Sequence, residues 1–510
     1  MTSITSKSSR KIGMLVSYIY SFVSIVVSLV YVPLLLNGIG EEEYGLYQLV
    51  GSVMSYIVSI NGVLSAGVGR FYCMYRAEGE SNEAQNVLGI AKRLYVVISI
   101  IVMVSIFVLA FVAKFIYQSS LAAVQLDELF FMILVLGINT IITMFNSISI
   151  AVITAFERFV FLKVSSLLSL LAQPIIVALL LPVAPNAIMV TFVVLATNLA
   201  CALVQCAYTK FVLKIRSAYL EWNLDLVKGL FRFSGSLLLV AIADQIFWKT
   251  DQLIVGYLYG AAAVAIYSIG SQIYSAYMAL GTAASSVFLP RVSELYHRNK
   301  DMKAISELFS KVGKISFLIL GVVLSAFLVL GPDFIELWAG PGYFDSYLVA
   351  AIVMVPFTID LIQAVGLTIL QVINKYLFRG VMYLIVAVVN VFLTLLFLQI
   401  WGIPGAAIST ALAMLLGNGF IMNWYYWKVV GLDIPYFWRS VSRPMLPALF
   451  LTVAFGVFYW TIPMEHGSWA TFLFAGLLFV VLYFLFEYLF GLNAIEKRAL
   501  RATLRRRQAK

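Results

Sequence analysis

Long apolar segments separated by short polar ones run along the whole 510-residue sequence. A helix that crosses the hydrocarbon layer of a membrane needs about 20 apolar residues, and fourteen segments approach that length. They span residues 12–36, 45–68, 94–118, 129–156, 164–184, 186–208, 234–258, 261–288, 314–331, 347–373, 378–399, 402–426, 445–462 and 468–490. The pattern predicts an all-α membrane protein with about 14 transmembrane helices.

Composition supports this class, since 62% of the residues are hydrophobic and 11% are charged. Soluble domains average about 45–50% apolar and about 25% charged residues, so soluble enzymes, nucleic-acid-binding proteins and disordered chains are excluded. The three cysteines and two histidines lack the spacing of a metal or catalytic site, and no phosphate-binding glycine loop is present. We therefore expect no catalytic residue, no metal and no cofactor.

Positive charge is distributed asymmetrically among the loops. If the N-terminus is cytoplasmic, all but two of the 34 Lys and Arg residues fall in inner segments, the exceptions being Lys114 and Lys249. Outer loops carry acids such as Glu41, Asp127 and Asp345 instead. Because Lys and Arg concentrate in cytoplasmic loops, the sequence predicts that both termini are cytoplasmic. The first apolar segment is too long for a signal-peptide core and no small-residue cleavage site follows it, so we expect a retained first helix.

The first six helices resemble the next six. An offset of about 220 positions relates Gly40 to Gly260 and Tyr47 to Tyr267, which is the sign of an internal repeat. Six is even, so the two copies insert in the same orientation and are parallel repeats. The predicted parts are an N-terminal lobe at 1–208, an amphipathic cytoplasmic linker at 209–233, a C-terminal lobe at 234–426, two extra helices at 427–490 and a basic cytoplasmic tail at 491–510.

Polar side chains at membrane depth are costly and by default face a bundle interior or a water-filled cavity. One face of the helix at 234–258 carries Asp244, Gln245, Trp248, Lys249, Asp251 and Gln252, and the helix at 347–373 carries Asp360 near its midpoint. Asn146 and Asn198 belong to similar stripes on two helices of the first lobe. The stripes in both lobes predict a hydrophilic cavity between them.

Two interpretations stay open for each basic candidate. Lys249 is either neutralised by Asp244 or Asp251, or it binds an anionic group of a substrate. Arg70 is either an interfacial residue whose charge reaches toward water or a headgroup contact at a cytoplasmic gate.

The other candidates also have a structural alternative. Asp360 is either a proton or sodium relay or a structural hydrogen-bond acceptor, and Glu487 is expected to be structural. Asn and Gln side chains can simply join helices through hydrogen bonds. Tyr267 and Tyr274 share one helical face and are candidate platforms for stacking on sugars.

The turn Leu36-Asn-Gly-Ile-Gly-Glu-Glu-Glu-Tyr-Gly-Leu-Tyr47, followed by Gly-Val-Gly-Arg70-Phe and Tyr75-Arg-Ala-Glu-Gly79, resembles the Wzx-type oligosaccharide flippases. These form part of the polysaccharide-transporter branch of the multidrug/oligosaccharidyl-lipid/polysaccharide exporter superfamily. The resemblance covers essentially the whole chain, including fourteen helices in two lobes and cytoplasmic termini.

This resemblance implies alternating-access transport of an undecaprenyl-pyrophosphate-linked glycan across a bacterial inner membrane, for O-antigen or another surface polysaccharide. It implies membrane lipids, a polysaccharide polymerase and a chain-length regulator as partners. Some relatives have cavities dense in Arg and Lys, whereas here only Lys249 lies deep in a helix, which argues against a strongly acidic glycan.

Three other functions remain as alternatives. A cation-coupled multidrug exporter typically has twelve helices, and a lipid II flippase has the same number as this chain. A membrane polymerase or ligase would normally carry a large outer loop, whereas the loop at 331–346 is short.

Overall fold

The computed structural model describes residues 2–215, 219–282, 288–299, 301–462, 466–494 and 496–498, and within these ranges its regular elements are all helices. The first part of the chain forms α1 (Thr2–Ile39), α2 (Glu41–Ala77), α3 (Ser81–Ile116), α4 (Ala123–Ala155), α5 (Phe159–Leu180), α6 (Ala187–Ala207) and α7 (Leu224–Thr282). It continues with α8 (Leu289–Asn299), α9 (Met302–Ala339), α10 (Phe344–Ile362), α11 (Ala364–Val372), α12 (Tyr376–Trp401), α13 (Ile403–Met414), α14 (Met422–Tyr425), α15 (Ile434–Thr461) and α16 (Trp469–Phe486). Short 3-10 or π-helical turns are η1 (Tyr117–Ser119), η2 (Tyr208–Val212), η4 (Leu415–Ile421), η5 (Tyr426–Val430) and η6 (Glu487–Gly491).

The predicted fold class is confirmed. Within the described residues, 13 helical segments are long and apolar enough to cross a membrane. One of them, α7, has 59 residues and is bent at Gly260, where φ is 80°, so it contains the two spans predicted at 234–258 and 261–288. Counting α7 twice gives the fourteen predicted spans.

The predicted span at 347–373 differs in detail. It is divided at Gln363 into α10 and α11, because the backbone there leaves the helical region (φ −100°, ψ 9°). The span at 402–426 forms α13 and α14 with the π-helical η4 between them. The C-terminal part of the tail predicted at 491–510, from residue 499 on, lies outside the described residues.

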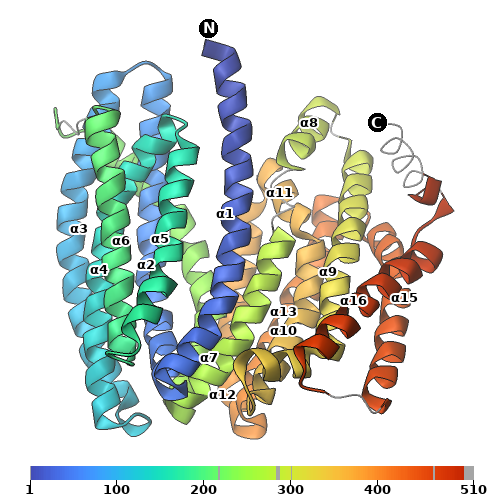
Figure 1. Ribbon diagram of the computed structural model, residues 1–510. Helices are drawn as coiled ribbons and strands as arrows, with labels where there is room; N and C mark the ends of the chain where they lie inside the picture. Colours follow the sequence, from blue (N-terminus) through green and yellow to red (C-terminus); the bar gives the residue numbers. More distant parts are fainter. Residues whose placement is uncertain are drawn as a thin grey trace. The chain divides into compact units, whose positions relative to one another are not determined.

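The chain divides into two compact units, residues 1–268 and 269–510. In the first unit α4 packs against α2, α3 and α6, while α5 packs against α1 and α6 (Figure 1). In the second unit α9 packs against α10, α15 and α16, and α13 packs against α10 and α12. The unit boundary falls within α7, so residues 234–268 pack with the first unit, and the lobe limits inferred from the repeat stay a prediction.

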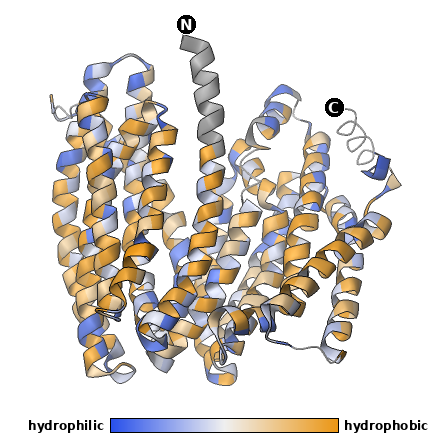
Figure 2. Cartoon of the chain, viewed as in Figure 1, coloured by the Kyte–Doolittle hydropathy of each residue, from blue (hydrophilic) through white to orange (hydrophobic). Residues whose placement is uncertain are grey.

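Hydrophobic residues occur along most of the length of the helices (Figure 2), and many of their side chains are exposed. On α3, for example, Val97, Ile100 and Val104 are each about 60% exposed. Continuous apolar surface of this kind is not tolerated in water by soluble monomers but is the expected surface toward lipid. The protein is therefore a multi-pass membrane protein.

Three local features recur near the offset that the sequence repeat predicts. Gly40 and Gly260 have almost the same conformation, with φ of 86° and 80° and extended ψ of 170° and −171°. Both join consecutive helices at a position where only glycine is unstrained. The same conformation at both places is what a duplicated turn would give.

The second feature is an aromatic stack. Phe161 stacks on Tyr208 with ring centroids 3.7 Å apart and planes 15° apart, and Phe378 stacks on Tyr425 at 3.7 Å and 5°. The third is a pair of side-chain amides, Asn146 with Gln205 and Gln363 with Asn423. These recurrences support the predicted duplication.

Candidate functional site

Polar side chains of the first unit connect its helices through hydrogen bonds. Asn61 on α2 donates to Thr143 on α4 (3.3 Å), and Asn198 on α6 donates to Asn139 on α4 (3.0 Å). Asn146 on α4 also donates to Gln205 on α6 (2.9 Å), so the candidate residues Asn146 and Asn198 both join neighbouring helices in this conformation. That arrangement is the helix-joining alternative for amide stripes.

A second group of polar contacts involves α7. Tyr267 donates its hydroxyl proton to Asp251 (2.9 Å), and each of these residues is 1% exposed. Gln252 accepts a hydrogen bond from Ser52 of α2 and donates to Ser268 (3.2 Å). These candidates form a satisfied polar core within the first unit, as buried polar groups require.

This packing bears on the two candidate stacking platforms. Tyr267 is bonded to Asp251, and Tyr274 is 4% exposed. A sugar could reach either ring only after the helices around it moved. Their role in sugar stacking stays a prediction.

Lys249 lies deep in α7 and is half-buried. It makes no ion pair or hydrogen bond with any residue in the part of the chain that the structure describes. One of its two predicted partners, Asp251, is hydrogen-bonded to Tyr267, and the other, Asp244, is half-buried. The N–H donors of Lys249 are thus not bonded to any of the described side chains or carbonyls.

Arg70 is exposed near the end of α2, and its guanidinium lies over the Phe233 ring of α7, 4.4 Å from the centroid. A cation over an aromatic face at an exposed site contributes about 0.5–1 kcal/mol. α2 can approach α7 here because Gly67 has no side chain: a Cβ there would lie 2.8 Å from the Ser234 hydroxyl. This contact gives Arg70 a structural role and leaves its outer edge accessible.

Asp360 has a counter-ion that the sequence did not reveal. Its carboxylate lies 4.0 Å from the guanidinium of Arg379, and the two side chains are 23% and 16% exposed. Arg379 lies at the start of the span predicted at 378–399, and α12 begins at Tyr376 and places it in the first helical turn. The nearby break at Gln363 is held by paired amides, since Gln363 donates to Asn423 (2.8 Å).

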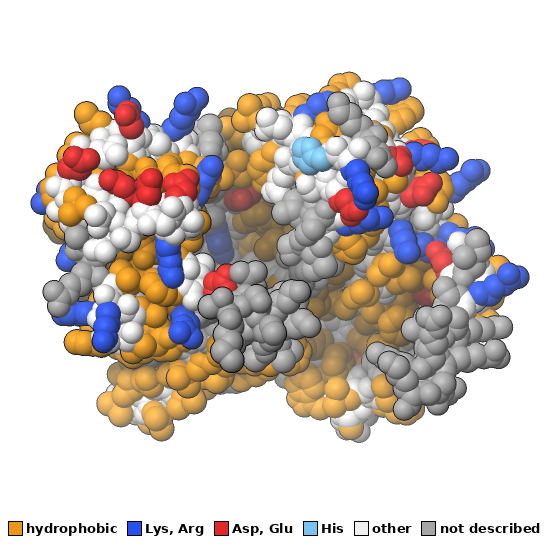
Figure 3. All heavy atoms as spheres, turned by 90° about the horizontal axis from the view of Figure 1, so that it is seen from above, with side chains coloured by type: hydrophobic (Ala, Val, Ile, Leu, Met, Phe, Trp, Pro, Cys, Tyr) orange, Lys and Arg blue, Asp and Glu red, His pale blue; other side chains and the backbone are white. Residues whose placement is uncertain are grey.

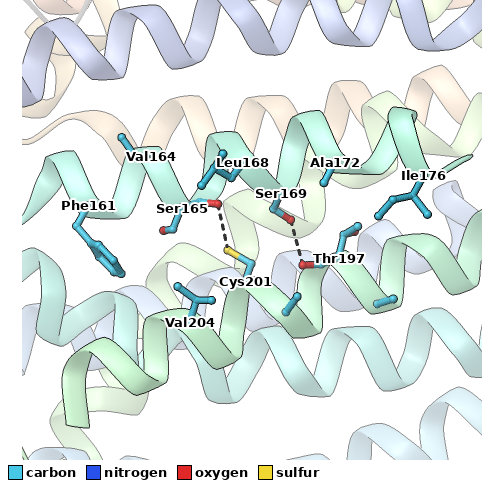
Figure 4. A pocket seen from close by; sticks show the side chains of 12 residues that line it. Phe161, Val164, Ser165, Leu168, Ser169, Ala172, Ile176, Thr197, Cys201 and Val204 are labelled. Carbon is cyan, nitrogen blue, oxygen red and sulfur yellow. Dashed lines mark hydrogen bonds between the residues drawn. The ribbon is translucent and has the colours of Figure 1, made fainter. Parts of the chain in front are cut away.

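Two cavities of the first unit differ in chemistry. One, of about 380 Å³, is an apolar groove between α5 and α6 (Figure 4). Its hydroxyls are already bonded, since Ser169 donates to the Thr197 carbonyl at 3.1 Å. The groove therefore offers a surface to lipid chains and none to sugars.

The other cavity has a volume of about 680 Å³ and is lined by Lys92 and Lys210 together with Ser149, Cys206 and Thr209. Many other Lys and Arg side chains, with several acidic ones, lie on the face shown in Figure 3. Sequence reasoning placed these lysines in loops and did not bring them together. The distribution of Lys and Arg along the sequence did not indicate that these two lysines share a cavity.

A buried ionisable cluster in the second unit was also missed. Glu487 in η6 is 2% exposed, and Lys314 on α9 is 5% exposed. Lys314 is ion-paired with Glu496 (2.7 Å). Among the described residues no group of three or more His, Cys, Asp or Glu side chains is arranged to hold a metal ion.

A membrane-embedded bundle with a duplicated set of helices and polar residues inside its spans has the architecture of a transporter. The chain belongs to the polysaccharide biosynthesis protein family, whose model matches residues 39–348. The family resemblance inferred from the sequence is thereby confirmed.

Known relatives agree with this assignment. A Shigella flexneri protein described as an O-antigen transporter is 22% identical over 228 residues, which cover 44% of this chain and 53% of that protein. The chain thus matches about half the length of this curated relative.

Solved structures show the fold. The lipid II flippase MurJ in an inward closed conformation is similar with a TM-score of 0.74 at 14% identity, over 92% of this chain and 98% of that one. A multidrug-resistance MATE transporter of the MOP superfamily, facing inward, has a TM-score of 0.65 at 12% identity, over 80% and 95% of the two chains. The fold is that of this transporter superfamily.

Proposed function

We propose that the protein is a flippase that carries undecaprenyl-pyrophosphate-linked oligosaccharides from the cytoplasmic to the outer face of a bacterial inner membrane, by alternating access, for surface polysaccharide synthesis. Family membership and the O-antigen transporter relative support the polysaccharide substrate class. The fold, shared with a lipid-linked-substrate flippase, supports the mode of transport. We expect no covalent chemistry from the chain.

The proposal rests mainly on the position of Lys249 inside a span. A lysine within a span costs about 2.5–3.5 kcal/mol to insert, and this one has no anionic partner among the described residues. A passing pyrophosphate or acidic sugar would supply the missing anion. Lys249 is therefore the proposed contact for the substrate's negative charge, and Asp244 and Arg70 remain accessory candidates.

Replacing Lys249 tests this role. Lys249→Ala should leave the membrane abundance of the protein unchanged and abolish surface polysaccharide, because it removes no ion pair between described residues. Lys249→Arg should retain part of the export, since the charge is kept. Abundance is measured by immunoblotting of membranes, and export by surface glycan staining in the same cells.

Two results would contradict the substrate contact. Low abundance of Lys249→Ala, restored by Asp244→Asn or Asp251→Asn, would show that the lysine neutralises an aspartate, because an uncompensated buried charge costs about 3–5 kcal/mol. Normal abundance with normal export would make Lys249 a tolerated residue with no transport role. Gln245→Ala, on the same face of α7, provides a matched control for the loss of a polar side chain.

A second candidate function is lipid II transport, which the high structural similarity to MurJ favours. Both substrates are polyprenyl pyrophosphates, so Lys249 does not distinguish them. Complementation does: a lipid II flippase restores growth to cells depleted of their own, and a polysaccharide flippase restores only the surface glycan.

A further inference from the structure

A glutamate is buried without a partner near the end of the last membrane span. Glu487 begins the π-helical turn η6 and is 2% exposed. Neither of its carboxylate oxygens accepts a hydrogen bond from any described residue. An ionised carboxylate in such surroundings would lose its hydration without compensation, which costs far more than burying a neutral acid.

None of the described residues that surround Glu487 donates a hydrogen bond to its carboxylate. Gly491 follows it by one turn, and a Cβ at that glycine would lie 3.3 Å from the backbone of Pro444 on α15. Proline has no backbone N–H. One turn before it, the hydroxyl of Tyr483 is also buried without a partner. Tyr483 reaches α9 at Gly321, where a Cβ would lie 2.5 Å from that hydroxyl.

The buried lysine near Glu487, Lys314, forms an ion pair with a different acid, Glu496. Lys314 on α9 donates to both carboxylate oxygens of Glu496, at 3.0 and 2.7 Å. Burial works against ionised Glu496, but the bond from Lys314 and the backbone N–H of Asn493, with the charge of Arg443 on α15, outweigh it and hold the pKa of Glu496 below its ordinary value. Glu496 is therefore the ionised partner of Lys314.

Two other titratable groups nearby are hydrogen-bonded to residues other than Glu487. Tyr277 on α7 bonds Thr358 at 2.7 Å, and Lys497 donates to the Leu489 carbonyl at 2.9 Å. One buried lysine thus faces two carboxyl groups and neutralises one of them. Within the part of the chain that the structure describes, no cation is then left to pair with an ionised Glu487.

We propose that Glu487 is a proton-binding site, neutral in this conformation, and that its proton is released when Lys314 exchanges Glu496 for Glu487. In that exchange the O–H bond of the Glu487 carboxyl breaks, its proton passes to water, and the carboxylate formed pairs with the Lys314 ammonium. This inference rests on the proposed transport function, since it assigns the group through which a proton gradient would drive the flippase.

The structure favours Glu487 over Asp360 for this role. Asp360 lies beside Arg379 and is compensated by it, whereas Glu487 has neither a cation nor a donor bound to it among the described residues. The sequence favoured Asp360 because it lies at the middle of its predicted span. The depth of a residue in a span does not predict whether a counter-ion lies beside it. The ion-coupling role of Asp360 stays a prediction that the same experiment tests.

Infrared spectroscopy of the purified protein in lipid nanodiscs tests the proton site without requiring transport. A carbonyl band of a protonated carboxylic acid should persist at neutral pH, disappear in Glu487→Gln and remain in Glu336→Gln, an exposed glutamate on α9. A band that Glu487→Gln leaves unchanged would overturn the proposal. Loss of the band in Asp360→Asn instead would move the site to Asp360.

Chemical labelling provides a second measurement on the unmodified chain, should Glu487→Gln accumulate poorly. Dicyclohexylcarbodiimide reacts with protonated carboxyls in apolar surroundings, so mass spectrometry should locate the adduct at Glu487 and show that it is lost at alkaline pH. Protection by sodium at constant pH would overturn the proton assignment in favour of a sodium site. An unlabelled Glu487 would overturn both.

The coupling role has its own readout. Surface polysaccharide made by Glu487→Gln cells should no longer respond to external pH, while the wild type does. Loss of the infrared band together with an unchanged pH response would overturn coupling and leave the flippase assignment intact. Absence of any glycan phenotype in Lys249→Ala, with the band present, would instead count against the proposed function alone.

Discussion

Asp360 and Lys249 are both charged residues within predicted spans, but they differ in what surrounds them. The Asp360 carboxylate has Arg379 at 4.0 Å, and Lys249 has no such partner among the residues described. A charge that lacks a partner in the protein is free to bind a ligand, whereas a paired charge first has to be released. This difference supports the proposal that Lys249 contacts a ligand, whereas Asp360 is paired within the protein.

Removing one member of the Asp360–Arg379 pair should destabilise the second unit. Asp360→Asn leaves the Arg379 guanidinium without its carboxylate, and breaking a buried pair costs about 3–5 kcal/mol. We expect less, about 1–3 kcal/mol, because the pair is long and partly exposed. Thermal unfolding in detergent measures the loss.

The double variant Asp360→Asn/Arg379→Gln is the control for that measurement. It should recover most of the stability, because no charge is then left alone. If the double variant unfolds at the same temperature as Asp360→Asn, the two residues do not act as a pair.

Partners of polar residues were the least predictable part of the candidate site. Sequence spacing offered Asp251 as a partner for Lys249, yet Asp251 is bound by Tyr267, which lies beyond the bend at Gly260. A helical projection assumes a straight helix, so it cannot bring together residues on the two sides of a bend. The types of residue at the site were predictable, and their contacts were not.

At the scale of elements, the two equivalent turns allow a matched comparison of strain. Gly40→Ala and Gly260→Ala both place a side chain at positive φ with extended ψ, which costs about 1–3 kcal/mol. A Cβ at Gly40 meets nothing within 4 Å, whereas one at Gly260 lies 2.8 Å from the Ser120 carbonyl oxygen. Gly260→Ala should therefore lower the unfolding temperature more, and equal losses would show that the turn alone sets the cost.

The two aromatic stacks allow a second matched comparison. Alanine double-mutant cycles for Phe161 with Tyr208 and for Phe378 with Tyr425 should each give a coupling energy of about 0.5–1.5 kcal/mol. The geometries are nearly the same, so the two energies should agree. A coupling near zero in one cycle only would indicate that the duplicated geometry has lost its energetic role there.

Helices were predictable as elements because every long apolar segment in the sequence corresponds to a helix. Interruptions within the helices were not predictable from the sequence. The break at Gln363 and the π-helical turn η4 lie inside predicted spans, η6 lies at the end of one, and η2 and η5 begin at the last residue of theirs; none of these turns contains a proline. Such turns depend on how neighbouring helices pack, and hydrophobic patterning does not record that packing.

At the scale of the whole chain, the duplication is kept where helices are joined and altered where charge is placed. The offset that relates Asn146 to Gln363 also relates Thr143 to Asp360. Thr143 accepts a neutral hydrogen bond from Asn61, while Asp360 lies against Arg379. The two copies therefore share their amide pair and differ in their ionisable groups.

The last prediction concerns the orientation of the chain in the membrane. A reporter fused after Lys510, which lies outside the described residues, should show cytoplasmic activity, because fourteen spans return the chain to the side on which it began. Fusions at Asp127 and Asp345 should report the outer side, since both acids lie in loops on the opposite face by the distribution of Lys and Arg. Alkaline phosphatase and green fluorescent protein fusions measure the two sides independently. An external signal at Lys510 with external signals at the other two positions would mean that an even number of spans, instead of the predicted five, follows Asp345. An external signal at Lys510 with a cytoplasmic signal at Asp345 would instead mean that α7 crosses the membrane once despite its bend at Gly260.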